Sequence, residues 1–394
     1  MVLKQASRQW NAELTLKLVD FGFTQSAHDH CLFTKATSAG IMALLVYVDD
    51  ILVTAPTVAL IQSVKDYLHS FFSIKDLGDA RYFLGLEVAR NSDGIYVAQT
   101  KYIQDIIRDI GLVNAKSTST PFPLGLKLSD NYGALLVDPE KYRRLIGRLL
   151  HLGFTRPDVS HPVQQLSQFL TKPCEAHWKA TVHIVRYLKG TPTTGLFLPS
   201  ASSFALRAYC DADWASCTDS RCSLTGFCVF LGDALISWKT KKQSIVSRST
   251  AEAEYRSLAA TVCELKWLSY ILSDLGISVP LPIQLFCDNQ AVLHIMANSV
   301  ERTKHIELDC HIARDAYKDG FILPSFVCSS LQLANIFTKV LSLKHFASFL
   351  AKLGLIAMQP RPTCGGAITY STEAAAIDSA MLQVDEEDVV RDVG

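Results

Sequence analysis

The sequence predicts an α+β protein with more than one domain, and two observations carry this prediction. Apolar residues recur at helical spacing in some segments and in short strand-like runs in others. About half of the 394 residues (49%) are hydrophobic, which is enough to bury two or three cores. Lys plus Arg equals Asp plus Glu, at 38 each, so any binding of nucleic acid must depend on local basic surfaces.

The first part of the chain alternates between helical and strand-like patterns. The expected elements are, in order, a helix over 6–22, strands at 31–33, 41–46 and 51–53, a helix over 57–71, and a hairpin over 82–99. The turn between the second and third strands contains Asp49 and Asp50, so we expect the hairpin tip to present two carboxylates to solvent. The later hairpin turns at Asn91-Ser92-Asp93-Gly94.

From about 101 to 190 the pattern is mainly helical. Asp138-Pro139 is typical of a capped helix start, and leucines at 145, 149 and 152 share one face of the helix that follows. Lys141, Arg144 and Arg148 form a basic stripe on another face, which is either a solvated surface or a surface that follows phosphates. A second helix is expected over 176–189, with a basic end.

A new series begins after the Ser-rich loop at 199–203. The expected elements are strands ending at 211 and spanning 226–231 and 234–238, a helix over 250–274, a strand at 283–288, further helices, a strand at 321–327 and a helix over 331–339. This order predicts a separate domain with a mixed sheet under helical cover. Beyond about 355 the composition turns to Ala, Gly, Ser and acid, which predicts a disordered tail.

The pattern of cysteines and the length of the apolar runs argue against several classes of protein. Eleven cysteines are scattered without a Cys-x-x-Cys pair, which favours a reducing compartment over a disulfide framework or a paired-cysteine zinc site. No apolar stretch reaches the ~20 residues of a membrane span, and the N-terminus has no signal-peptide pattern. The sequence therefore predicts a soluble protein without a membrane partner.

Three carboxylates of the second half are candidates for metal chemistry. Asp211 ends a strand, Glu254 shares an apolar helix stripe with Leu258 and Val262, and Asp288 closes another strand. A carboxylate on an apolar stripe is costly to bury without a partner or a metal. Considered one at a time, two of these residues have an ordinary structural alternative: Asp211 could close a turn and Asp288 could cap a helix. The nearby Glu252 fits a capping box with Ser249 and is not a candidate ligand.

The second half of the chain contains a series of short sequence boxes. They are Tyr209-Cys210-Asp211-Ala212-Asp213-Trp214-Ala215, Ser237-Trp238-Lys239 with Lys241-Lys242-Gln243, Ser249-Thr250-Ala251-Glu252-Ala253-Glu254-Tyr255, Cys287-Asp288-Asn289, Lys304-His305-Ile306 and Ile336-Phe337-Thr338-Lys339. Together these boxes resemble the ribonuclease H domain of copia-type LTR retrotransposon polyproteins. So many boxes in one order are highly specific.

Upstream boxes resemble the reverse transcriptase of the same polyproteins. They are Leu3-Lys4-Gln5-Ala6-Ser7-Arg8-Gln9-Trp10, Tyr47-Val48-Asp49-Asp50, Tyr82-Phe83-Leu84-Gly85-Leu86-Glu87-Val88, Thr155-Arg156-Pro157-Asp158 and Arg186-Tyr187-Leu188-Lys189-Gly190-Thr191. The resemblance covers roughly 2–356. It implies part of a palm at 1–123, a helical thumb or connection at 124–200 and a ribonuclease H-like domain at 201–340. The remaining segment, 341–394, is expected to hold a C-terminal helix and an acidic tail, and the acidic tail does not share the resemblance.

The resemblance implies a two-metal site that cuts the RNA strand of an RNA/DNA hybrid. By position, Asp211, Glu254 and Asp288 are three of its four metal ligands, and Asn335 stands where the family has a fourth acid. The cofactor is then Mg²⁺, for which Mn²⁺ may substitute. An amide lacks the charge that helps to hold a cation, so we expect weakened cleavage rather than none.

In the reverse transcriptase half, Asp49 and Asp50 match the paired acids of a polymerase metal site. The resemblance places a third acid and the fingers upstream of Met1, so we expect this chain alone not to synthesise DNA. Binding of nucleic acid is still expected. The candidate contacts are Lys141, Arg144, Arg148, Arg186, Lys189, Lys241 and Lys242.

Two alternative readings stay open from the sequence alone. One is a non-catalytic protein that binds nucleic acid or other retrotransposon-derived polypeptides. The other is an unstable remnant, because an incomplete palm would leave an exposed sheet edge that invites aggregation.

Overall fold

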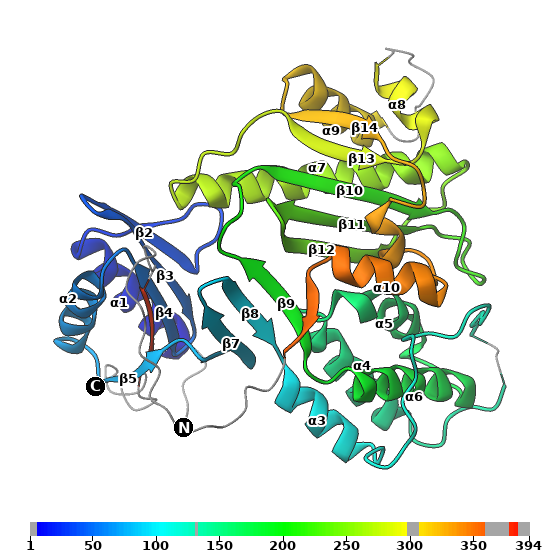
Figure 1. The fold of residues 1–394 in the computed structure, drawn as a ribbon, viewed down its shortest axis with the longest axis horizontal. Helices are drawn as coiled ribbons and strands as arrows, with labels where there is room; N and C mark the ends of the chain where they lie inside the picture. Colours follow the sequence, from blue (N-terminus) through cyan, green and yellow to red (C-terminus); the bar gives the residue numbers. More distant parts are fainter. Residues whose placement is uncertain (1–5, 131–132, 298–306, 359–377, 385–394) are drawn as a thin grey trace. The chain divides into compact units, whose positions relative to one another are not determined.

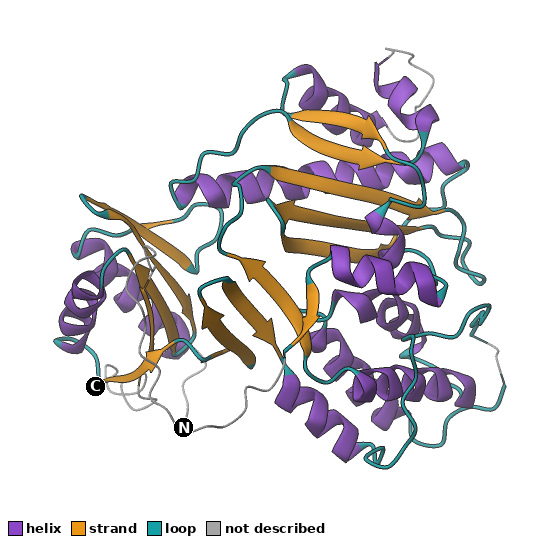
Figure 2. Cartoon of the chain, in the orientation of Figure 1, coloured by secondary structure: helices purple, strands orange, loops and turns teal. Residues whose placement is uncertain are grey.

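The computed structural model describes residues 6–130, 133–297, 307–358 and 378–384. The chain divides into two compact units: one contains residues 1–88, 267–278 and 361–394, and the other contains 89–266 and 279–360. Each unit mixes helices with strands (Figures 1 and 2), which confirms the predicted α+β class. Among the described residues, every helix is too short or too polar to cross a bilayer.

The first unit is built on a six-stranded sheet with the order β1-β2-β3-β4-β16-β5. Its elements are α1 (Ala6–Asp20), β1 (Thr24–Gln25), β2 (Leu32–Thr37), β3 (Gly40–Tyr47), β4 (Asp50–Ala55), α2 (Val58–His69), β5 (Ile74–Asp79) and β16 (Asp378–Val384). Residues from both helices and the sheet share one apolar core, in which Leu18, Leu44, Val53 and Leu68 are fully buried. The helices and hairpin predicted for this region are confirmed.

The acidic hairpin is a tight turn. Tyr47 pairs with Asp50 at the end of the β3–β4 ladder, which leaves Val48 and Asp49 at the tip. Val48 has a φ of 54°, a left-handed conformation that is rare for a β-branched residue. Asp49 and Asp50 are half-buried, so the expectation that both point freely into solvent is only partly met.

The tail contributes a strand, which the sequence did not predict. Residues 378–384 form β16, which pairs antiparallel with β4 on one side and with β5 on the other. The expectation of a disordered tail is therefore wrong for these seven residues. The acidic run Asp385-Glu386-Glu387-Asp388 lies outside the described residues, as do the N-terminal Leu3-Lys4-Gln5 and the Lys304-His305-Ile306 box.

The second unit contains a five-stranded sheet with the order β12-β11-β10-β13-β14. Its elements are β10 (Leu206–Asp213), β11 (Leu224–Leu231), β12 (Ala234–Lys242), α7 (Thr250–Asp274, whose last turns belong to the first unit), β13 (Ile283–Cys287), α8 (Gln290–Ala297), α9 (Glu307–Lys318) and β14 (Ile322–Phe326). β10, β13 and β14 run parallel, β11 runs antiparallel to β10, and β12 runs antiparallel to β11. The long α7 lies along one face of this sheet (Figure 2).

A helical segment and a second sheet complete this unit, except that the residues of this sheet up to Val88 belong to the first unit. The helices are α3 (Thr100–Asp109), α4 (Pro139–Leu152), α5 (Ser160–Leu166), α6 (Glu175–Gly190) and α10 (Leu343–Lys352). The sheet runs β15-β9-β8-β7-β6, built from β6 (Tyr82–Phe83), β7 (Leu86–Asn91), β8 (Gly94–Ala98), β9 (Thr194–Pro199) and β15 (Leu355–Ala357). Asp138 caps α4 through the N–H of Lys141 at 3.1 Å, as predicted.

One apolar core joins these helices to the sheet of β10–β14. It includes Tyr142 of α4, Ile184 of α6, Phe230 of β11 and Phe337. The boundary expected near residue 200 therefore falls inside a continuous core. The helix expected over 331–339 is instead a short 3₁₀ helix, η3 (Leu333–Phe337), whose hydrogen bonds include one from the Thr338 N–H to the Asn335 carbonyl.

Candidate active site

Three elements place the candidate carboxylates. Asp211 lies near the carboxyl end of β10, Asp288 directly follows β13, and Glu254 lies in the second turn of α7. β10 and β13 are parallel neighbours, so their carboxyl ends meet at one edge of the sheet. This topology explains how residues 77 positions apart in the sequence can approach each other.

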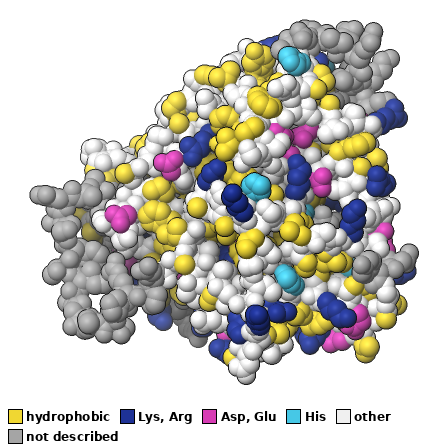
Figure 3. Space-filling view, turned by 45° about the vertical axis from the view of Figure 1, so that its right-hand side comes forward, with side chains coloured by type: hydrophobic (Ala, Val, Ile, Leu, Met, Phe, Trp, Pro, Cys, Tyr) yellow, Lys and Arg dark blue, Asp and Glu magenta, His cyan; other side chains and the backbone are white. Residues whose placement is uncertain are grey.

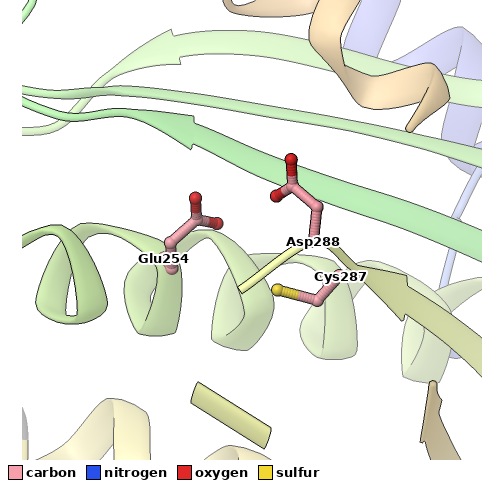
Figure 4. A group of neighbouring side chains, drawn as sticks. All are labelled: Glu254, Cys287 and Asp288. Atoms are coloured by element: carbon pink, nitrogen blue, oxygen red, sulfur yellow. The ribbon is translucent and has the colours of Figure 1, made fainter. Parts of the chain in front are cut away.

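Glu254 and Asp288 face a common space. Ligating atoms of Glu254, Cys287 and Asp288 all lie within 4.8 Å of one another, and the two carboxylates point to the same side (Figure 4). Glu254 is only 3% exposed, and its Oε2 has no hydrogen-bond partner among the described residues. A buried and unpaired carboxylate oxygen is costly, and a bound cation would remove that cost.

Asp211 is fully buried and is held by two side chains that follow η3. The Thr338 hydroxyl donates to Asp211 Oδ2, and Lys339 Nζ lies 3.1 Å from Asp211 Oδ1. The same ammonium lies 2.9 Å from Asn335 Oδ1. Lys339 therefore places a positive charge between the first expected ligand and the amide.

Asn335 is linked in turn to Asp288. Its Nδ2 donates to the Ser329 carbonyl at 2.9 Å, and the Ser329 hydroxyl donates to Asp288 Oδ2 at 2.7 Å. The contacts thus run from Asp211 through Lys339, Asn335 and Ser329 to Asp288. Three of the four expected positions belong to one hydrogen-bonded chain, and Glu254 lies beside Asp288 at its end.

The backbone under Asp211 is fixed by polar contacts from two directions. Ser257 of α7 donates to the Asp211 carbonyl at 2.8 Å, and Gln332 Nε2 donates to the Cys210 carbonyl at 2.9 Å. Gly226 pairs with Asp211 across the ladder, and a Cβ on Gly226 would lie 2.5 Å from Thr338. Glycine at this position therefore allows η3 to approach Asp211.

The alternative roles considered for Asp211 and Asp288 do not apply, whereas the one considered for Glu252 does. Asn289, rather than Asp288, caps α8, because its Oδ1 accepts from the Ala291 and Val292 N–H groups. Asp211 lies within β10 rather than in a turn. Glu252 serves the start of α7, where Ser249 Oγ accepts from its N–H and Glu252 Oε2 accepts from the Arg248 N–H.

Burial and crowding of negative charge raise the carboxyl pKa values. Burial raises the pKa of Asp211, and Lys339 opposes this shift. Burial raises the pKa of Glu254 to about 10, with Asp211 next among the contributing groups. Burial also raises the pKa of Asp213, which lies two residues after Asp211. Burial would lower the pKa of Lys339, but the hydrogen bond to Asp211 and the negative charges of Asp211, Asp288 and Glu254 together raise it.

The donor set fits a divalent cation. Carboxylate and amide oxygens from Asp211, Glu254, Asp288 and Asn335 are the hard ligands that Mg²⁺ prefers. The unpaired Glu254 oxygen supplies an independent reason for a cation. The thiol of Cys287 adds a soft donor to this group, which suits Zn²⁺ better than Mg²⁺.

The second acidic pair, Asp49 and Asp50, lies in the first unit. Burial raises the pKa of Asp50, and the neighbouring Asp49 raises it further. The Asp49 carbonyl accepts from the Val384 N–H of β16 at 3.0 Å.

The basic residues that were expected to contact nucleic acid differ in whether their side chains are exposed or bound to other groups of the protein. Arg144 and Lys241 are exposed, whereas Arg148 pairs with Asp109 at 2.6 Å and Lys141 lies over the Trp178 ring at 4.8 Å. Three others are tied to nearby groups: Arg186 to the Lys116 carbonyl, Lys189 to the Ala115 carbonyl, and Lys242 to Gln168 and Cys217. Lys and Arg are scattered in small groups on the face in Figure 3.

Sequence reasoning did not assign roles to Lys339, Thr338, Ser329 or Cys287. Lys339 and Thr338 belong to the box Ile336-Phe337-Thr338-Lys339, and Cys287 directly precedes Asp288. Because these three residues lie next to predicted metal ligands in the sequence, their involvement in the site could have been predicted. Ser329 lies in a loop without such a signal.

Comparisons with known proteins were made for the whole chain. Residues 1–123 match the family model for reverse transcriptase (RNA-dependent DNA polymerase). The chain is similar to a retrovirus-related Pol polyprotein from transposon RE2 of Arabidopsis thaliana, with 41% identity over 93% of this chain. It spans only 25% of that polyprotein. A putative transposon Ty5-1 protein of Saccharomyces cerevisiae is 35% identical over 67% of this chain and 86% of its own length.

A solved structure shows a more distant likeness. It is a foamy viral protease-reverse transcriptase in complex with RNA/DNA hybrid, which is 11% identical with a TM-score of 0.39, covering 87% of this chain and 43% of that chain.

Proposed function

This chain belongs to the copia-type retrotransposon Pol polyproteins, and from that premise we propose that its second unit cleaves the RNA strand of RNA/DNA hybrids with divalent cations. The observation that carries the proposal is the approach of Glu254 to Asp288, with a buried Glu254 oxygen that has no partner among the described residues. Asp211 and Asn335 are connected to Asp288 through Lys339 and Ser329. Together the four candidate ligands would hold two divalent cations, which would supply activation of the attacking water and stabilisation of the leaving oxygen.

The residues of the site have two roles: some would hold the cations, and others orient the side chains that hold them. Glu254 and Asp288 would hold a cation between α7 and the end of β13, and Asp211 would hold one from β10. Thr338 and Lys339 fix the Asp211 carboxylate in one orientation. Ser329 fixes Asp288, and the buried backbone contacts of Ser257 and Gln332 keep β10 from shifting. Orientation of ligands by neighbouring hydrogen bonds is worth ~10–100-fold in metal affinity or activity.

Substituting Asn335 with Asp is expected to increase hybrid cleavage. The side chain keeps its shape, its new charge adds to the attraction for a cation, and it partly offsets Lys339 at 2.9 Å. The loss of the bond to the Ser329 carbonyl acts in the opposite direction. We expect a cleavage rate up to ~10-fold higher and a lower Mg²⁺ concentration for half-maximal rate. The measurement is RNA-strand cleavage of a labelled hybrid across a Mg²⁺ titration.

Asn91→Asp is a suitable control, because it adds the same charge in the turn between β7 and β8. It should leave both quantities unchanged. Equal rates for the wild type and Asn335→Asp would refute a special cost of the amide, and absence of any Mg²⁺-dependent cleavage in both would refute the proposed activity.

A second candidate function is binding of nucleic acid without cleavage. The position of Lys339 favours it, because an ammonium between Asp211 and Asn335 can neutralise charge that a cation would otherwise neutralise. The hairpin with Asp49 and Asp50 would in that case be a scaffold, and we propose that it does not support DNA synthesis in this chain alone.

Arg144 and Lys241 are the basic side chains best placed for phosphate contact, because both are exposed. We expect Arg144→Ala or Lys241→Ala to weaken hybrid binding at all sequences alike and to lower the slope of log affinity against log salt by ~1 each. Fluorescence anisotropy with a labelled hybrid at several salt concentrations measures this. Lys65→Ala is the comparison, since Lys65 is paired with Asp76 at 2.8 Å. Identical slopes for all variants would argue against these phosphate contacts.

A further inference from the structure

β16, formed by residues 378–384, lies between β4 and β5 in the sheet of the first unit. β16 is antiparallel to both β4 and β5, so β4 and β5 run parallel to each other. They are joined through α2, the usual crossover for parallel strands. In this sheet β4 and β5 are not neighbours, because the order is β4-β16-β5. The β4-α2-β5 segment therefore encloses a slot one strand wide.

The fit of β16 in that slot is extensive. Six residue pairs join it to β4, from Asp378 opposite Ala55 to Gln383 opposite Asp50, and further pairs join it to β5, ending with Val384 opposite Ile74. Ala380, Leu382 and Val384 enter the same apolar core as Leu68 of α2. Ser379 and Met381, which point to the other face, are buried as well. Burial on both faces is typical of a central strand.

Without β16, the slot would leave polar backbone groups unpaired on both flanking strands. Neighbouring strands lie ~4.8 Å apart, so β4 and β5 across an empty slot would be ~9.6 Å apart, too far for direct hydrogen bonds. The Val384 N–H also reaches the Asp49 carbonyl at 3.0 Å, beside the acidic turn. Open edges of this kind recruit other strands.

We propose that the β4/β5 slot is a strand-binding site, and that residues 378–384 of the same chain occupy it as a donor strand. The segment closes a sheet that the N-terminal residues alone leave open. The ligand class is an extended peptide with small or apolar residues at alternate positions, because backbone pairing supplies affinity and the core-facing side chains supply selectivity. Any polypeptide that pairs with the inner edge of β4 must first displace β16.

The test uses the full chain and a proline in the donor strand. Leu382→Pro removes a ladder N–H and places a ring in the middle of a central strand. We expect hydrogen exchange of the β4 and β5 amides to accelerate by more than ~100-fold, while amides of β10 and β11 in the second unit keep their protection. Val390→Pro, beyond the strand in the sequence, is the matched control and should leave β4 protected.

A peptide added in trans distinguishes a vacated slot from a general loss of folding. A labelled peptide with the sequence of residues 377–386 should bind Leu382→Pro saturably and restore the protection of β4. It should bind the wild-type chain at least ~10-fold more weakly, because the slot is already occupied. The same peptide carrying proline at position 382 should bind neither.

Three outcomes would overturn the proposal. The first is unchanged protection of β4 in Leu382→Pro. The second is failure of the peptide to bind this variant or to restore protection. The third is protection in the wild type that falls on dilution, which would make a second copy the donor.

Discussion

Asp211→Asn is expected to reduce Mg²⁺-dependent cleavage of hybrid RNA by more than ~100-fold, because loss of a neighbour that merely orients a metal ligand already costs ~10–100-fold. Asp211 is fully buried near the end of β10, and its two oxygens accept from Thr338 and Lys339. The amide keeps the shape of the side chain but removes its charge. The remaining ligands would then hold a cation less tightly, and Lys339 would face it without a counter-charge.

The measurement combines cleavage, binding and unfolding on the same preparations. We expect Asp211→Asn to bind the hybrid as tightly as the wild type and to unfold at nearly the same denaturant concentration, since phosphate contacts and packing are unchanged. Asp233→Asn is the control, because Asp233 is exposed and pairs only across the surface with Arg207 at 3.2 Å. Cleavage that survives in Asp211→Asn would assign the activity to another site and favour the binding function.

The inward position of Glu254 was predictable because helical periodicity is local. Its stripe of Leu258 and Val262 places it on the buried face of α7, and Glu254 is 3% exposed as expected. The same reasoning separated Glu252 from Glu254, although the two lie only two residues apart. Local patterns were sufficient wherever one element determines the direction of a side chain.

The contacts of Lys339 were not predictable, because they depend on two segments far apart in the chain. Asp211 and Lys339 are 128 positions apart, and the sequence predicted a full helix where a short 3₁₀ helix stands. The 3₁₀ turn brings Asn335 and Lys339 together over Gly226, where a Cβ would collide with Thr338. A glycine in a strand signals close approach but does not name the partner.

The strand at 378–384 could not be predicted from the sequence for a related reason. Its apolar run is short and is followed directly by four acidic residues, so the composition of the tail as a whole favoured disorder. Strand formation there depends on pairing with β4 and β5, which lie about 300 positions earlier. The exposed palm edge expected from the sequence is therefore covered by a segment that no local pattern could assign to it.

Two boxes recognised in the sequence meet in a buried ion pair. Arg156 donates to both Asp158 oxygens, from Nε at 2.9 Å and from Nη2 at 2.7 Å. Its Nη1 donates to the Thr191 carbonyl, and Nη2 donates also to the Thr191 hydroxyl, both at 2.8 Å. Tyr187 donates to Asp158 at 2.6 Å. Arg156 and Asp158 are inaccessible to solvent. The Thr155-Arg156-Pro157-Asp158 box is thereby held to the end of α6.

Arg156→Met is expected to destabilise the second unit by about 3–5 kcal/mol, because it leaves the Asp158 carboxylate buried without its counter-charge and the Thr191 carbonyl without its donor. Denaturant unfolding followed by tryptophan fluorescence measures this loss. Arg108→Met is the control, since the Arg108–Asp105 pair is exposed and such pairs contribute at most ~1 kcal/mol. Arg156→Met combined with Asp158→Leu should recover part of the loss, because the uncompensated charge is then absent. Equal losses in the single and double variants would show that packing of Arg156, rather than its charge, holds α6 in place.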